Sequence, residues 1–207
     1  MKISRFFVWV LVACSQPAPP SPGYPSGPAA PPVATSAPRP TSAVASTPTA
    51  RAPVTLSIIG TNDLHGALER LPVFAGFVAN LRAARAADGG VLLLDGGDMF
   101  QGTLESNLTE GADVVRAYNY LGYAAAAVGN HEFDYGPVGP AVTAASAADD
   151  PRGALKARAS EARFPFVVSN IVDAASQQRI DWPNMPASTM VEVAGIKVGI
   201  VGATTES

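Results

Sequence analysis

Two histidines and several acidic residues occur in short glycine-containing segments, in a pattern that suits metal chemistry. Asp63 and His65 are two residues apart, so in an extended segment both side chains point to the same side and can reach one ion. Asp98 lies in a second such segment, and Asn130 and His131 lie in a third. Carboxylate oxygens and imidazole nitrogens are ligands of divalent metals. Because the chain has only two histidines and both lie in these segments, the sequence indicates a metal site.

Each segment follows a short apolar run that is bounded by glycine, which favours a buried strand over a helix. Residues with helical spacing lie between the runs and give a β-α-β-α-β order. This order predicts a parallel sheet with right-handed crossovers. The carboxyl ends of such strands share one edge, where ligands bind in open α/β sheets. The predicted elements are Val54–Gly60, Leu71–Ala87, Val91–Leu94, Ala112–Leu121 and Ala124–Val128.

The residues after the third strand complete the expected fold. Gly136–Ala162 is predicted to be mostly helical and exposed, with a break at Asp149–Pro151. Phe166–Asn170 is predicted to be a further strand. Thr189–Val193 and Lys197–Val201 are expected to form a β-hairpin that packs on the sheet.

Local turn chemistry is the alternative explanation for each residue taken alone. Asp95 and Asp98 can cap the next segment or form Asx-turns, as most Asp-Gly loops do. Asn130 can be a turn residue, and His131 with Asp134 can be a buried hydrogen-bonded pair. The metal interpretation is favoured because three segments, each after an apolar run, carry ligand-type residues together.

Composition and charge limit the partners of the chain. Its 207 residues suffice for one domain with a sizeable core. The formal net charge is −3, and from Val54 onward ten Lys and Arg stand against seventeen Asp and Glu. An acidic domain without a basic run gives no electrostatic basis for binding nucleic acid. It would also repel a phosphate unless bound cations reversed the local charge.

The first 53 residues predict export and membrane anchoring. The apolar run Phe6–Ala13 is too short to span a bilayer, so residues 1–13 are predicted to be a signal peptide. Leu11–Cys14 resembles the lipobox of bacterial lipoproteins, which implies cleavage before Cys14 and lipidation of its thiol. An ordinary signal peptide with an incidental cysteine is the alternative. Residues 14–53 are rich in Pro, Ala, Ser and Thr and are expected to be a disordered tether. The expected location is extracytoplasmic, on a membrane of the cell envelope.

Together the motifs resemble the calcineurin-like metallophosphoesterases, and most closely their branch of secreted 5′-nucleotidases and UDP-sugar hydrolases. Thr61–Gly66, Gly97–Thr103 and Gly129–Gly136 carry the resemblance, in that order. It extends to Phe164–Ile171 and Lys197–Gly202. It implies an α/β sandwich of mixed or parallel sheets flanked by helices, with residues 54–207 as the N-terminal part of the phosphoesterase domain.

The resemblance also implies which residues bind metal. Two divalent ions, of Mn²⁺, Zn²⁺, Fe or Co²⁺, would share the carboxylate of Asp98. Asp63 and His65 would complete the protein ligands of the first ion. Asn130 would join Asp98 on the second ion.

Catalysis is implied for His131, which would not bind metal and whose ring would be held by Asp134. The implied activity is hydrolysis of a small-molecule phosphate ester, expected to be a nucleotide. The attacking group would be a hydroxide that bridges the two metals.

The match to the family pattern stops at Gly202. The family supplies further histidines from later motifs and a C-terminal domain that holds the nucleoside, so the chain is expected to be an incomplete, N-terminal fragment. Three other ester substrates remain open for the same site: a UDP-sugar, a 2′,3′-cyclic nucleotide, or a sulfur-bound ester of the thiosulfohydrolase type. An alternative of another class is a non-catalytic lipoprotein domain that binds metal.

Overall fold

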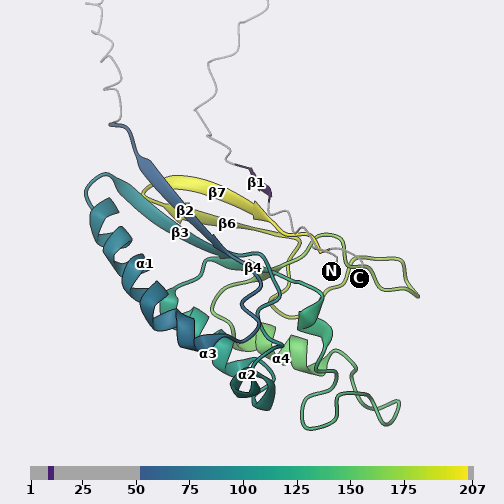
Figure 1. Cartoon of the computed structure of the whole chain (residues 1–207). Coiled ribbons are helices and arrows are strands. Elements are labelled where there is room, and N and C mark those ends of the chain that lie inside the picture. Colours follow the sequence, from purple (N-terminus) through teal and green to yellow (C-terminus); the bar gives the residue numbers. More distant parts are fainter. Residues whose placement is uncertain (1–8, 12–51, 205–207) are drawn as a thin grey trace, which may run out of the picture. The chain divides into compact units, whose positions relative to one another are not determined.

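Two β-sheets and their flanking helices make up the part of the chain that the computed structural model describes, residues 9–11 and 52–204 (Figure 1). The larger sheet contains β2 (Thr55–Thr61), β3 (Gly89–Asp95), β4 (Ala125–Ala127) and β5 (Phe166–Val167) in that spatial order. All neighbouring strands in it are parallel, as the sequence predicts. The predicted strand Phe166–Asn170 is shorter than expected and ends at Val167.

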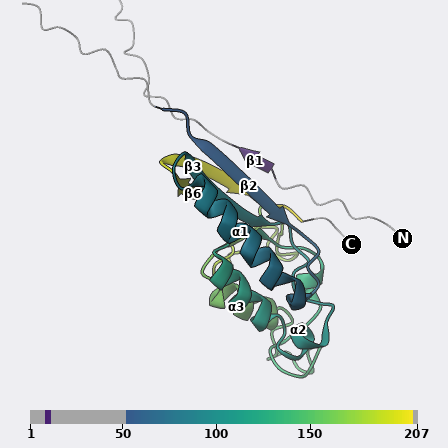
Figure 2. The same cartoon turned by 60° about the vertical axis from the view of Figure 1, so that its left-hand side comes forward.

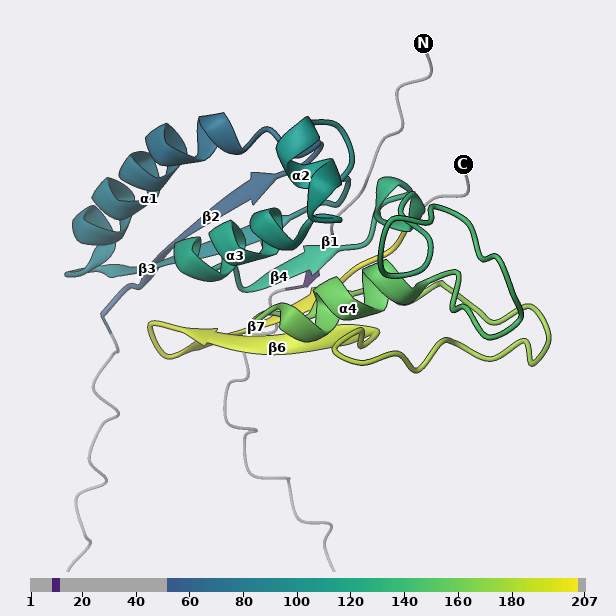
Figure 3. The same ribbon diagram turned by 90° about the horizontal axis from the view of Figure 1, so that it is seen from below.

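Three longer helices lie between successive strands of this sheet in the sequence. They are α1 (Leu71–Arg85), α3 (Ala112–Leu121) and α4 (Gly153–Glu161). Helix α3 has the predicted bounds and stops at Gly122, which takes the left-handed backbone conformation typical of a helix end. Figures 2 and 3 show α1 and α3 side by side on one face of the sheet. Short helical turns lie at η1 (Leu68–Arg70), α2 (Leu104–Leu108) and η2 (His131–Phe133).

Strand β3 separates two hydrophobic cores because successive side chains of a strand point to opposite faces. Leu93 packs on the helical side, in a cluster that includes Tyr118 of α3. Leu92 and Leu94 point to the other side and join Ile200. The central strand is therefore covered on both faces.

The second sheet supplies the cover on that other face. It contains the hairpin of β6 (Ser188–Val193) and β7 (Ile196–Val201), close to the predicted bounds. Ala194 and Gly195 make its turn with positive φ values of 51° and 76°, which suits a tight hairpin. A three-residue strand, β1 (Trp9–Leu11), pairs antiparallel with β7.

The prediction of a mostly helical, exposed segment over Gly136–Ala162 is wrong in its first part. Residues 136–152 form turns and bends, and only α4 is helical. Gly136, Pro137, Gly139 and Pro140 lie in the non-helical part, where proline lacks the amide donor and glycine costs backbone entropy. Helix α4 is also not exposed all round, since Ala154, Leu155, Arg158 and Ala159 are buried.

Most of the predicted signal peptide, the lipidation site Cys14 and the tether to residue 51 lie outside the described residues. The signal peptide, the lipidation of Cys14 and the tether therefore stay predictions from the sequence. Within residues 9–11 and 52–204, no helix has the length and apolar character needed to cross a bilayer.

At its carboxyl end, β3 holds a buried carboxylate, Asp95, that belongs to the fold. Its Oδ1 accepts a hydrogen bond of 2.8 Å from the amide of Gly97, which is the Asx-turn that the alternative interpretation expects. Its Oδ2 accepts from the hydroxyl groups of Thr61, at 2.6 Å, and Tyr118, at 2.8 Å. Burial raises the pKa of Asp95 to about 6. The side chain thus ties β2, β3 and α3 together below the loops.

This shift predicts a pH dependence of stability. The folded-state pKa of Asp95 lies above its ordinary value of 3.8. Its contribution to the free energy of unfolding is therefore complete below about pH 4 and is lost as the pH rises through about 6. A shift of about two pKa units corresponds to a change of about 3 kcal/mol in the free energy of unfolding. Asp95→Asn, which is neutral throughout, should unfold with a correspondingly weaker pH dependence between pH 4 and 8 in denaturant titrations. Identical pH profiles for the two proteins would contradict this assignment.

Candidate metal centre

The loops after β2 and β3 remain hydrogen-bonded to each other beyond the ends of the two strands. The amide of Gly96 donates to the carbonyl of Thr61 at 2.7 Å. The amide of Asp63 then donates to the carbonyl of Gly97, and the amide of His65 to the carbonyl of Asp98, each at 3.0 Å. Parallel pairing thus continues into the loops and places Asp63 and His65 beside Asp98.

Three predicted metal ligands have a backbone conformation that is uncommon for side chains other than glycine. The φ angles of Asp63, His65 and Asp98 are 53°, 50° and 59°. The expectation that Asp63 and His65 lie in an extended segment is therefore wrong, because the backbone bends at both residues. Such outliers cost free energy and gather at functional sites, where surrounding contacts maintain them.

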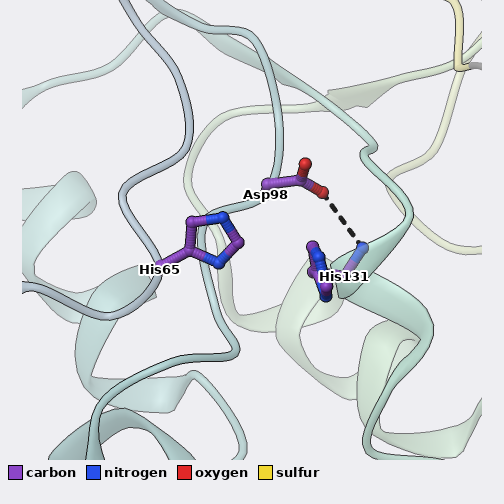
Figure 4. A group of neighbouring side chains, drawn as sticks. All are labelled: His65, Asp98 and His131. Carbon is purple, nitrogen blue, oxygen red and sulfur yellow. Dashed lines mark hydrogen bonds between the residues drawn. The ribbon is translucent and has the colours of Figure 1, made fainter. Parts of the chain in front are cut away.

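His65, Asp98 and His131 converge from the three loops at the carboxyl edge of the sheet (Figure 4). One ligand atom from each lies within 4.8 Å of those of the other two. The two imidazole rings meet edge to face with their centroids 4.9 Å apart. The amide of His131 donates to Asp98 Oδ1 at 3.0 Å. Asp98 therefore makes a contact across two loops, which a local Asx-turn does not explain.

The orientation of the His65 ring is fixed by a hydrogen bond at Nδ1. Nδ1 lies 2.7 Å from the carbonyl oxygen of Gln101, which can only accept, so Nδ1 carries the proton. Nε2 then keeps a free lone pair, as in most metal-ligating histidines. The same Nε2 lies 3.8 Å from Asp63 Oδ1, so both predicted ligands of the first ion point to one region.

His131 is held in the same way by a carboxylate. Its Nδ1 lies 2.6 Å from Asp134 Oδ2, and both side chains are partly exposed, in contrast to the buried pair of the alternative interpretation. This hydrogen bond is the main reason why the pKa of His131 lies above its ordinary value of 6.5. Because Nδ1 is engaged by Asp134, only Nε2 of His131 remains for a metal or a substrate.

Asn130 lies at the start of η2, in the same loop as His131. Glu132, the residue after His131, was not predicted from the sequence to belong to the site. It is 1% exposed, and its carboxylate accepts hydrogen bonds from the amides of Asp98, Met99 and Gly129. Burial raises its pKa to about 7, against the opposing effect of these donors. An acidic residue between a histidine and an aromatic gave the only sequence signal for it.

Two glycines let the second and third loops come close. A Cβ atom at Gly129 would lie 2.2 Å from Asp98 Oδ1 and 2.6 Å from the amide nitrogen of Asp98. Gly97 has a φ of 101°, and its Cβ would lie 2.6 Å from the amide of Gly129. Only glycine lets backbone approach the carboxylate this closely.

The donor set fits a divalent metal ion. It combines the Asp98 carboxylate with the imidazole of His65, whose Nε2 lies 3.8 Å from Asp63 Oδ1, and such a set suits Mn²⁺, Zn²⁺, Fe or Co²⁺. A cysteine ligand is absent from the described residues, since the single cysteine of the chain lies outside them.

The sequence is similar to those of known 5′-nucleotidases. A 5′-nucleotidase of Diplobatis ommata is 32% identical over 167 residues, which are 75% of this chain and 26% of that protein. The protein UshA of Yersinia enterocolitica is 32% identical over 159 residues, or 73% of this chain and 26% of its own length. The chain is a homologue of the 5′-nucleotidase and UshA proteins. It spans about a quarter of the length of these relatives.

A solved structure of this nucleotidase family agrees with the fold. The 5′-nucleotidase precursor of Thermus thermophilus is 33% identical and superposes with a TM-score of 0.54, over 72% of this chain and 28% of that protein. No family model matches the chain. The expected fold class, α/β with a parallel sheet flanked by helices, is confirmed.

The close approach at Gly129 predicts a loss of metal affinity on adding one methyl group. Gly129→Ala should displace the Asp98 carboxylate and weaken Zn²⁺ or Mn²⁺ binding by about tenfold or more. Gly76→Ala is the matched control, because a Cβ there meets nothing within 4 Å. It should keep the native affinity and raise stability by about 0.5–1 kcal/mol. Calorimetric titration measures both affinities, and equal affinities in the two variants would contradict the geometry.

Proposed function

We propose that the chain is the metal-binding part of a phosphoester hydrolase that acts on nucleotides. The observation that carries the proposal is the convergence of His65, Asp98 and His131 from three strand ends. The family relationship supports it, since relatives are 5′-nucleotidases. The acidic charge of the domain gives further support, because a phosphate ester would need bound cations there.

The proposed metal ligands are Asp63, His65, Asp98 and Asn130. Asp63 and His65 would serve one ion, Asn130 the other, and Asp98 both. When bound, two divalent ions supply an activated water and stabilise charge on the attacking and leaving oxygens. The chain's own contribution is to fix the ligands: Gln101 sets the His65 tautomer, and the amide of His131 donates a hydrogen bond to the Asp98 carboxylate.

His131 is proposed to act on the substrate. Asp134 holds the proton on Nδ1 and, without bound metal, raises the pKa of the ring, which favours the imidazolium form. In that form Nε2 can donate a proton to the leaving oxygen or bind a phosphoryl oxygen. The amide of His131 is already bound to Asp98, which keeps the ring next to the metal ligands.

Metal binding and hydrolysis of AMP and p-nitrophenyl phosphate, in Mn²⁺ or Zn²⁺, test this proposal. Asp98→Asn should lose both metal and turnover, because the shared ligand is weakened on both ions. His131→Ala should keep the metals and lower kcat by about 10²–10⁴-fold, the usual contribution of a general acid. Failure of the native chain to bind any metal would overturn the proposal.

The two variants also test the individual roles. Full metal occupancy in Asp98→Asn would contradict its role as the shared ligand. Loss of metal in His131→Ala would make His131 a ligand instead of a substrate-facing group, and unchanged kcat would remove it from catalysis.

We also propose that Cys14 carries lipid and that the domain is anchored outside the cytoplasm. Support comes from the sequence alone, in the apolar run before Cys14 and its similarity to a lipobox. Mass spectrometry of the protein from bacterial membranes should find an acylated N-terminal Cys14. An unmodified Cys14 in a chain that still begins at Met1 would contradict the anchor.

A further inference from the structure

Glu132 lies where two loops of the candidate metal centre meet. It belongs to η2, directly after His131, and is 1% exposed. Its Oε2 accepts hydrogen bonds from the amides of Asp98, at 2.9 Å, and Gly129, at 2.7 Å. Its Oε1 accepts one of 2.6 Å from the amide of Met99. One buried carboxylate therefore binds three backbone donors.

These donors come from separate parts of the chain. Asp98 and Met99 belong to the loop after β3, and Gly129 belongs to the loop after β4. In the opposite direction, the amide of His131 donates to Asp98 Oδ1 at 3.0 Å. The two loops are thus connected in both directions, and the separation of the Asp98 carboxylate from His131 depends on both contacts.

The chemistry of the three donors requires a carboxylate at residue 132. An ionised carboxylate has two oxygens that only accept, whereas a glutamine has one such oxygen and an amide group that donates. Its amide group would face a backbone N–H, with two donors in contact and a buried amide left without an acceptor. Burial raises the pKa of Glu132, but both of its oxygens accept backbone hydrogen bonds, and these charge-assisted contacts favour the ionised form.

We propose that Glu132 is a positioning residue, which sets the distance between Asp98 and His131 and thereby the metal affinity and turnover of the site. Both of its carboxylate oxygens are engaged by backbone amides, so it acts through the backbone of Asp98 and Gly129. This inference rests on the proposed metal site.

The test compares Glu132→Gln with a matched control in the native-length chain. Glu110 also accepts a backbone amide, from Gly139 at 2.5 Å, and is mostly buried, but it lies outside the metal loops. Glu132→Gln should weaken Zn²⁺ or Mn²⁺ binding by about 10–100-fold, as loss of an outer contact to a ligand does. Glu110→Gln should lower the thermal midpoint but keep the native metal affinity. The metal affinities of both variants are measured by calorimetric titration at a temperature at which both are folded.

A second variant keeps the test decisive if Glu132→Gln does not fold. Glu132→Asp retains two accepting oxygens but is one methylene shorter, so it cannot reach all three amides. Its metal affinity should lie between those of the native chain and Glu132→Gln. If the native chain hydrolyses substrate, kcat of this variant should fall by a larger factor than KM changes. Native metal affinity in either folded variant would overturn the inference, as would an equal loss in Glu110→Gln. A native chain that binds no metal would instead overturn the proposed function.

Discussion

Asp98 is the residue on which the candidate centre depends, because it is bound from three directions. Its carbonyl accepts the amide of His65 from the loop after β2. Its own amide donates to the Glu132 carboxylate, and its carboxylate accepts the amide of His131, both from the loop after β4. The parallel order of β2, β3 and β4 makes this possible, since it brings three carboxyl ends to one edge with Asp98 in the middle.

Electrostatics at this edge favours cations. The acidic groups Asp63, Asp98, Glu132 and Asp134 gather around two imidazoles, and the last three of them raise the pKa of His131. In an acidic domain such an edge would repel a phosphate unless cations were bound. The same arrangement favours metal binding and, without bound metal, raises the pKa of His131. Asp95 lies lower in the sheet, where its hydrogen bonds to Thr61 and Tyr118 support the strands that present the loops.

The sequence predicted the elements whose patterns are repeated and local. Helix α3 and the strands β2 and β3 follow from apolar periodicity and glycine ends, and their loops were expected at one edge because parallel strands end together. The failures have physical causes. The predicted helical segment Gly136–Ala162 includes the alanine-rich residues 141–148, but helix propensity is a weak signal without an apolar face, and glycine and proline precede them.

Site details were harder to predict because they depend on contacts between distant residues. The left-handed backbone of Asp63 and His65 is stabilised by hydrogen bonds to the loop after β3, which no local rule anticipates. Glu132 gave no sign that it would be buried, because its three donors become neighbours only when β3 and β4 pair. The ligand-type residues could be selected from the sequence, whereas the groups that position them could not.

A crystal structure of the chain with Zn²⁺, recorded with anomalous scattering at the zinc edge, would show directly whether the loops bind metal. If the three strand ends form a metal centre, a peak should appear bonded to the Asp98 carboxylate and to His65 Nε2, at roughly 2.0–2.2 Å from each. A peak remote from Asp98, or none at saturating zinc, would contradict the claim that these three strand ends form a metal centre.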